Sequence, residues 1–222
     1  MSEADRQKWD AKYAKCESPR ACAPDAWLVE CVDRLMASFG ASTVFRDFSE
    51  PASDAPHGAW TAPAAARVPR ALDVACGLGH NAVWLASRGW RVTAVDISSV
   101  GLERARRAAE GRSVAVRWVC ADLDSWEPPV EQFELVVVFR FWDRRILPRL
   151  IERALVPGGA VVLESFSRRQ LLRPDTHIHN PDFTIDVAEL PAFFGGLEVL
   201  VCREVDLPDR SVVRLLGRRR ER

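Results

Sequence analysis

Lysine is scarce in this chain of 222 residues. Lys8, Lys12 and Lys15 are the only lysines, and every other cationic side chain apart from histidine is arginine. Basic and acidic residues number 31 each, so the formal net charge is zero. A chain without net charge has no global field that recruits nucleic acid or an anionic membrane surface. We therefore expect neither a nucleic-acid partner nor a membrane partner.

Long apolar runs and paired cysteines are also missing. No stretch approaches the roughly 18–20 apolar residues of a membrane span. The polar opening MSEADRQKWD lacks the apolar core of a signal peptide. The six cysteines contain no CxxC pair, which argues against a disulfide framework and against a zinc site. These absences predict a cytoplasmic protein with reduced thiols and no bound metal.

From residue 70 onward, apolar runs alternate with helical segments. Five runs have the character of buried strands and lie at 71–75, 91–95, 114–119, 133–139 and 160–163. Three helices are predicted between them, at 81–87, from Ser98 or Ser99 to Ala109, and at about 143–155. Strands joined by helices form right-handed βαβ units and a parallel sheet.

The C-terminal part of the chain follows a different pattern. Two strand-like runs, 197–205 and 211–216, have no helix between them and should pair as an antiparallel hairpin. The predicted fold is therefore α/β: a Rossmann-like, doubly wound, mostly parallel seven-stranded sheet that ends in this hairpin.

The first 69 residues divide into two parts. Apolar positions at helical spacing predict one or two helices within 6–39, the second starting near Asp25, in an N-terminal helical segment at 1–48. Residues 49–69 contain four prolines and read as a loop insertion. The cofactor-binding domain is expected at 70–222, and the chain as a whole is expected to be a single domain.

The segment LDVACGLGHN, residues 72–81, leaves a strand, turns on glycines and enters a helix. Glycine lets the backbone approach a ligand closely, and the N-terminus of the helix offers free N–H groups. Two cofactor classes use this geometry. The string Gly77-x-Gly79-x-x-Ala82 satisfies the dinucleotide fingerprint, which makes an NAD(P)-dependent enzyme one interpretation.

The same segment also resembles the first motif of class I S-adenosylmethionine-dependent methyltransferases, an acidic residue followed by glycines at alternate positions. This chain keeps Asp73, Gly77 and Gly79 and carries Ala75 at the first glycine. The turn Pro157-Gly158-Gly159 and the terminal hairpin extend the resemblance. It implies S-adenosylmethionine as the cofactor.

Three carboxylates lie at or just after the ends of successive strands, and the resemblance implies a role for each. Asp73 is placed to reach the ammonium of the methionine moiety, where a pyrophosphate would be repelled. Asp96 is placed to accept both ribose hydroxyls, although NAD enzymes also use that position. Asp122 resembles the acidic residue that binds adenine. The full set of expected cofactor contacts is Asp73, Ala75, Gly77, Gly79, Asp96, Ile97, Asp122, Leu123 and Phe139.

Trp9 and Tyr13 resemble the Trp-x-x-x-Tyr opening of tellurite-resistance and thiopurine-type methyltransferases. In that group the N-terminal helix folds over the cofactor and the substrates are small soft nucleophiles. The i, i+4 spacing predicts one aromatic face, which either closes over the cofactor or packs on the core. Including residues after the fourth and fifth strands, the candidate substrate residues are Trp9, Tyr13, Arg140, Trp142 and His177.

The predicted function is methyl transfer from S-adenosylmethionine to a small molecule. A soft nucleophile needs no general base, whereas an oxygen or nitrogen nucleophile could use His177 or His179. A non-catalytic cofactor-binding module remains an alternative. A nucleic-acid methyltransferase is disfavoured, because the sequence lacks a target-reading domain and an Asn/Asp-Pro-Pro-aromatic motif.

Two arginine groups are expected to play no part in the site. Arg104, Arg106 and Arg107 share a predicted helix with Glu103 and Glu110, which indicates a solvated face. Residues 218–222 are expected to form a frayed terminus.

Overall fold

The computed structural model describes residues 3–16, 23–39 and 68–221. The predicted boundary at 48/49 and almost all of the predicted loop insertion at 49–69 lie outside these residues. Two helices precede the sheet, α1 (Glu3–Lys15) and α2 (Ala26–Phe39). The prediction of a helix that starts near Asp25 is therefore confirmed.

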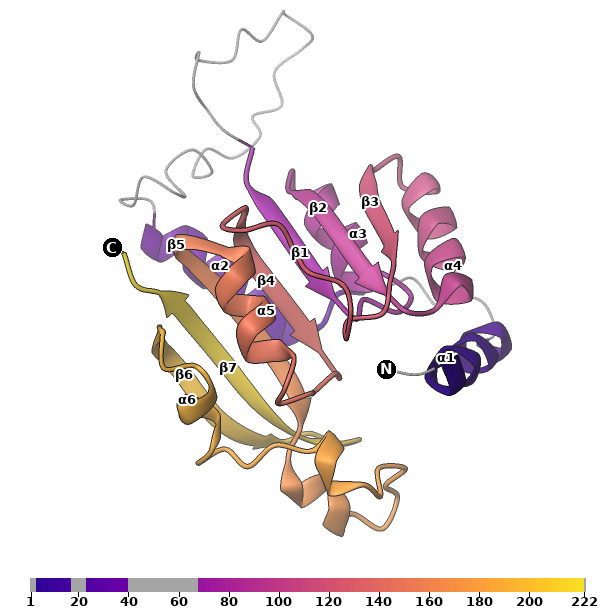
Figure 1. Cartoon of the computed structure of the whole chain (residues 1–222), viewed down its shortest axis with the longest axis vertical. Coiled ribbons are helices and arrows are strands. Elements are labelled where there is room, and N and C mark those ends of the chain that lie inside the picture. Colours follow the sequence, from indigo (N-terminus) through magenta and orange to yellow (C-terminus); the bar gives the residue numbers. More distant parts are fainter. Residues whose placement is uncertain (1–2, 17–22, 40–67, 222) are drawn as a thin grey trace, which may run out of the picture.

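A seven-stranded sheet of order β3-β2-β1-β4-β5-β7-β6 forms the centre of the structure (Figure 1). Its strands are β1 (Arg70–Val74), β2 (Arg91–Asp96), β3 (Val116–Cys120), β4 (Phe133–Phe139), β5 (Leu155–Phe166), β6 (Leu197–Asp206) and β7 (Ser211–Arg219). The first five strands are parallel, and β7 pairs antiparallel with both β5 and β6. The predicted α/β fold and its terminal hairpin are confirmed.

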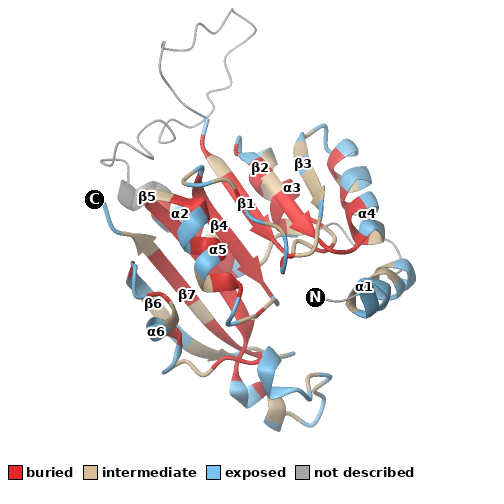
Figure 2. Ribbon diagram, viewed as in Figure 1, coloured by how far each residue is buried: buried red, intermediate tan, exposed pale blue. Residues whose placement is uncertain are grey.

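The sheet separates two hydrophobic clusters. Successive side chains of a strand point to opposite faces, so Ala71 packs with Trp27 and Leu28 of α2, whereas Leu72 packs with the opposite cluster. The connecting helices are α3 (His80–Ser87), α4 (Ser99–Glu110), α5 (Leu147–Ala154) and α6 (Leu190–Phe193). Every residue of β4 is buried, as expected for a strand covered on both faces (Figure 2).

Helix ends follow local chemistry. The Ser98 hydroxyl accepts a hydrogen bond from the Gly101 amide at 3.0 Å and caps α4, as predicted. Gly89 follows α3 with a φ of +87°, the left-handed conformation expected of it. Within the described residues, no helix is long and apolar enough to cross a membrane.

Several predicted boundaries are wrong. Helix α5 begins at Leu147 rather than near 143, because the amides of Arg145, Ile146 and Leu147 bond back to Asp143 in a turn. Strand β3 begins two residues late, at Val116, because Ser113 turns the chain with a φ of +56°.

Strand β5 is also longer than predicted, since it starts at Leu155 rather than at Ala160. The Pro157-Gly158-Gly159 segment is an irregularity inside the strand. Phe133 of β4 lies opposite Leu155, whereas Leu135 lies opposite Ala160. Because β5 pairs with β4 both before and after this irregularity, the strand continues across it as a bulge.

The C-terminal arginines are not all frayed. Arg218 and Arg219 belong to β7, and Arg219 forms an ion pair of 2.7 Å with Glu131. The Arg219 guanidinium also donates to the Glu152 carbonyl at 2.9 Å. The expectation of a frayed end is thus wrong for these two residues.

Gly79 has no side chain, which lets α3, α4 and β3 pack closely around it. Its φ is +72°, and a Cβ there would lie 2.7 Å from the Trp118 ring and 2.8 Å from Ala105 Cβ. Gly89 also has a positive φ, of +87°, but a Cβ there would have no neighbour within 4 Å. Both alanine variants carry the left-handed strain of about 1–2 kcal/mol, and only Gly79→Ala adds about 1–3 kcal/mol of overpacking. Urea unfolding should show the larger loss for Gly79→Ala. Equal losses would contradict this packing role.

Candidate functional site

The glycine loop joins β1 to α3 at the edge of the sheet where the parallel strands end. Gly77 has a φ of +55°, and Ala75 adopts nearly the same angle, +53°. A left-handed conformation costs a non-glycine residue about 1–2 kcal/mol. Ala75 is therefore strained, at the position where the motif described above has its first glycine. Such strain tends to gather at functional sites.

Asp96 ties this loop to the start of α4. The carboxylate is 5% exposed; Oδ2 accepts a hydrogen bond from the Gly77 amide at 2.7 Å, and Oδ1 accepts one from the Ser98 amide at 2.9 Å. Ser98 supplies the side-chain cap of α4, so Asp96 is not that cap. Each carboxylate oxygen has a second lone pair and can accept a further bond.

Asp73 is a deeply buried carboxyl group of the glycine-loop region. It lies one residue before the end of β1, is 2% exposed, and its Oδ2 has no hydrogen-bond partner among the described residues. Burial, followed by repulsion from Asp25, raises the pKa of Asp73 to about 8. At neutral pH the group is therefore mostly protonated.

The third predicted carboxylate, Asp122, lies further along the same edge. It is half-buried, and its Oδ1 accepts a hydrogen bond from the Asp124 amide at 2.9 Å. Its neighbour Leu123 and Ile97 after β2 are both buried. Because Asp96 pairs with Cys120 across β2 and β3, these positions follow directly from adjacent strand ends.

Besides Leu123, two further predicted residues belong to the core clusters. Phe139 is buried in the cluster beneath α2 and α3. Trp142 is 4% exposed and packs edge-to-face on Phe193 of α6, with ring centroids 5.4 Å apart. Trp142 therefore lies in the opposite cluster, between the sheet and α6, which argues against a direct substrate contact.

Helix α1 places the predicted aromatic pair over the glycine loop. The rings of Trp9 and Tyr13 stack with centroids 5.6 Å apart. A Cβ at Gly77 would lie 2.6 Å from the Tyr13 hydroxyl, and a Cβ at Gly101 would lie 2.8 Å from the Tyr13 ring. No residue of α1 is buried, so this aromatic face is not part of the core.

Polar contacts hold α1 against α4. Asp10 accepts hydrogen bonds from the Ser98 hydroxyl at 2.5 Å and from the Val100 amide at 3.2 Å. Arg104 donates to the Tyr13 carbonyl at 2.6 Å and to the Cys16 carbonyl at 2.5 Å. In Figure 1, α1 lies beside the first turn of α4, beyond the arrowheads of β2 and β3.

Arg104 therefore corrects the expectation of a wholly solvated arginine face. Arg106 and Arg107 do behave as predicted, because both form exposed ion pairs with Glu103. At the other side of α1, the Lys8 ammonium lies 6.0 Å from the ring centroid of Phe183. Helix α1 thus reaches from α4 to the segment that follows β5.

Arg140 begins a second group of polar residues, next to β4. It has a φ of +57°, and its guanidinium donates to Asp25 at 2.5 Å. Asp25 is also bound to Asn81 twice: its amide donates to Oδ1 at 2.9 Å, and its Oδ2 accepts from Nδ2 at 3.0 Å. The start of α2 and the first turn of α3 therefore hold Arg140 in place.

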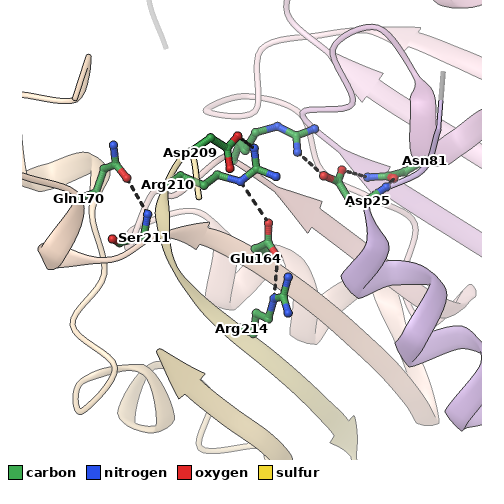
Figure 3. Close-up of polar contacts among 9 residues, drawn as sticks. Asp25, Asn81, Glu164, Gln170, Asp209, Arg210, Ser211 and Arg214 are labelled. Atoms are coloured by element: carbon green, nitrogen blue, oxygen red, sulfur yellow. Dashed lines mark hydrogen bonds and ion pairs between the residues drawn. The ribbon is translucent and has the colours of Figure 1, made fainter. Parts of the chain in front are cut away.

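Glu164 lies at the centre of the neighbouring charges on β5 and β7 (Figure 3). It is 1% exposed and accepts a hydrogen bond of 2.7 Å from Nε of Arg214. Arg210 approaches its other oxygen at 3.8 Å, which is an ion pair without a hydrogen bond. Arg140 donates its backbone amide to the Glu164 carbonyl at 2.8 Å, so both groups meet at this edge.

His177 is exposed and packs edge-to-face on Phe166, with ring centroids 5.8 Å apart. His179 is exposed as well. In the described part of the chain, no group of three or more His, Cys, Asp or Glu side chains could hold a metal ion.

The sequence did not identify Asp25, Asn81 and Arg210 as site residues, and it indicated Glu164 only as part of the segment that follows the predicted fifth strand. Each is brought to the site by contacts across long stretches of chain; the Asp25–Arg140 pair spans 115 residues. For Glu164 the local signal was its position directly after the predicted strand at 160–163, whose carboxyl end lies at the same side of the sheet as that of β1. Asn81, next to the glycine loop, offered a similar signal.

Comparison with known proteins agrees with this geometry. Residues 71–159 match a family described as "Methyltransferase domain". A probable thiol methyltransferase 2 of Arabidopsis thaliana is 26% identical over 162 residues, 67% of this chain and 68% of that protein. The ribosomal RNA small subunit methyltransferase C of Alcanivorax borkumensis is 34% identical over 103 residues, 42% of this chain but 31% of that protein.

Solved structures resemble the whole fold. One of them, concerned with conversion of a disulfide bond into a thioacetal group during echinomycin biosynthesis, has a TM-score of 0.64 and is 21% identical. The match covers 97% of this chain and 92% of that chain, and it supports the seven-stranded architecture from the first helix to the terminal hairpin.

Proposed function

We propose that the chain is a class I methyltransferase that binds S-adenosylmethionine and transfers its methyl group to a small acceptor molecule, and the family match at residues 71–159 supports this proposal. When bound, S-adenosylmethionine supplies a methyl group on a sulfonium, a leaving group that is already activated. The protein then contributes orientation and exclusion of water.

The buried carboxyl of Asp73 is the observation that carries this proposal. Its Oδ2 lacks a hydrogen-bond partner among the described residues, so it can accept a hydrogen bond from an ammonium group. A cation at that point favours the carboxylate form and lowers the pKa of Asp73 from about 8. A neutral ligand group would leave it protonated. The site thus suits the ammonium of the methionine moiety.

The remaining cofactor positions lie along the carboxyl ends of the parallel strands. We assign the ribose hydroxyls to Asp96, whose oxygens keep acceptor capacity beyond the Gly77 and Ser98 amides. We assign the adenine to the surroundings of Asp122, where Ile97 and Leu123 supply apolar surface. Ala75, Gly77 and Gly79 let the backbone approach the cofactor closely.

We propose that α1 is a lid over the cofactor. It contacts the glycine loop through Tyr13 and α4 through Asp10, without a single buried residue. A helix that is held by surface hydrogen bonds and buries little apolar surface can open at a low cost in free energy. Closure would shield the sulfonium from water.

We favour a small, soft nucleophile as the acceptor. A thiolate or a selenium or tellurium nucleophile attacks without a general base, and among the described residues the exposed histidines at 177 and 179 have no carboxylate partner of the kind that orients a catalytic base. The relative described as a probable thiol methyltransferase supports the same choice. A lid that lies across the strand edge also favours a small molecule over a polymer such as RNA.

The full-length protein should convert S-adenosylmethionine to S-adenosylhomocysteine when a suitable acceptor is present. A panel of a thiol, tellurite, a simple carboxylate and ribosomal RNA separates the acceptor classes, with the product measured by mass spectrometry. We expect turnover with the thiol or tellurite, and at least about a tenfold loss in Asp96→Ala, because charge-assisted bonds contribute about 1.5–3 kcal/mol. Turnover with RNA alone would contradict the proposal.

The lid role of Tyr13 makes a separate prediction. Tyr13→Ala should weaken binding of S-adenosylhomocysteine by about fivefold or more, through loss of aromatic contact of about 1 kcal/mol. Tyr13→Phe is the matched control and should keep most of the affinity, because it retains the ring. The melting temperature of the ligand-free protein should change little. A lower melting temperature with unchanged affinity would show that α1 is only a structural element.

A further inference from the structure

The turn between β6 and β7 carries an arginine with an unused hydrogen-bond donor. We propose that Arg210, assisted by Arg140, binds a carboxylate group of the methyl acceptor. This inference rests on the proposed function and adds to it: the acceptor is a small organic acid whose nucleophilic atom lies elsewhere in the molecule.

The backbone around Arg210 is fixed by several bonds. Its carbonyl accepts from the Leu207 amide at 2.7 Å, which closes the turn. The next residue, Ser211, donates its amide to Gln170 at 2.8 Å, and its carbonyl accepts from the Ser167 amide at 3.0 Å. Gln170 and Ser167 lie in the segment after β5, so that segment positions the turn (Figure 3).

Arg173 holds the same turn from outside. Its guanidinium donates to the Leu207 carbonyl at 3.2 Å and to the Pro208 carbonyl at 2.8 Å. Together these bonds fix the backbone of the turn that carries Arg210. The result is a preorganised cation, and preorganisation lowers the entropic cost of binding a ligand.

The guanidinium of Arg210 is incompletely satisfied. Its Nε is buried and has no hydrogen-bond partner among the described residues. The nearest carboxylate oxygen, on Glu164, lies 3.8 Å away, and Arg214 takes the other oxygen of Glu164 at 2.7 Å. Nη1 of Arg210 bonds to Asp209, whose side chain is 68% exposed, so that pair is solvated. Buried donors are nearly always paired in folded proteins, and an exception often marks a functional group.

The charges of this region leave room for an anion. Three guanidinium groups, those of Arg140, Arg210 and Arg214, face the buried or half-buried carboxylates of Asp25 and Glu164. The solvent-exposed Asp209 offsets the surplus positive charge only weakly, because water screens it. A single negative charge from a ligand would balance the region.

The ligand group that fits is a carboxylate. It is planar and singly charged, and its two oxygens match the parallel donors of a guanidinium, Nε and Nη. Arg210 approaches Glu164 of β5, whereas Arg140 follows β4 and is linked through Asp25 to Asn81 in the first turn of α3. An acceptor bound at Arg210 would therefore extend along the carboxyl ends of β5 and β4 towards the glycine loop.

Two matched thiols test this assignment. The full-length protein, with and without saturating S-adenosylhomocysteine, is titrated with 2-mercaptobenzoate and with 2-mercaptobenzamide, which differ by the charged group. We expect the acid to bind at least about tenfold more tightly than the amide. Arg210→Gln should remove that advantage and leave amide binding unchanged, while Arg210→Lys should keep part of it. Arg168→Gln, an exposed arginine paired with Asp186 and Glu189, is the control and should behave as wild type.

Three results would overturn the inference. Equal affinity of the wild-type protein for acid and amide would show that no carboxylate site exists. An undiminished preference in Arg210→Gln would place the site elsewhere. A loss of S-adenosylhomocysteine affinity in Arg210→Gln would reassign the arginine to the cofactor's own carboxylate. Failure of the wild-type protein to bind S-adenosylhomocysteine would instead contradict the proposed function, and the titrations without it still test Arg210.

Discussion

The buried carboxyl of Asp73 is the constraint around which the functional edge is organised. It sits at the end of β1 with one oxygen unpartnered among the described residues, at a cost of about 1–3 kcal/mol for a buried polar group. The glycine loop, the start of α2 and Arg140 surround it, and two of these neighbours, Ala75 and Arg140, hold left-handed backbone angles. The chain therefore accepts strain and an unmet hydrogen bond at one point, while the central strands β1 and β4 behind it are almost wholly buried. Such a concentration is typical of a binding site.

The sheet was predictable because burial follows a simple local rule. Strand β4 is an uninterrupted apolar run, and its bounds agree with prediction because no competing turn interrupts it. Prediction failed where pairing with a neighbour overrides local signals. The Pro157-Gly158-Gly159 segment has turn chemistry, yet it lies within β5 because β4 pairs on both sides of it. Helix α5 starts late for the opposite reason, since Asp143 binds the following amides and keeps them out of the helix.

The candidate site was predictable where it depends on strand ends and not where it depends on distant contacts. Asp73, Asp96 and Asp122 lie at or just after the ends of three parallel strands, and these ends meet at one side of the sheet. Arg104 and Arg210 gave no such signal. Arg104 looked like part of a solvated face but binds two carbonyls near the end of α1, and Arg210 is positioned by a loop some 40 residues earlier in the chain. The charge state of Asp73 also depends on burial that no motif encodes.

Proton release on cofactor binding tests the central claim most directly. At pH 7, Asp73 with a pKa of about 8 is mostly protonated, and an ammonium beside it would lower that pKa and expel the proton. Calorimetric titration of S-adenosylhomocysteine in phosphate and in Tris, which differ in ionisation enthalpy, measures the number of protons released. The account predicts release approaching one proton for the wild-type protein and almost none for Asp73→Asn. A binding enthalpy that is the same in both buffers for the wild-type protein, or equal release by Asp73→Asn, would contradict it.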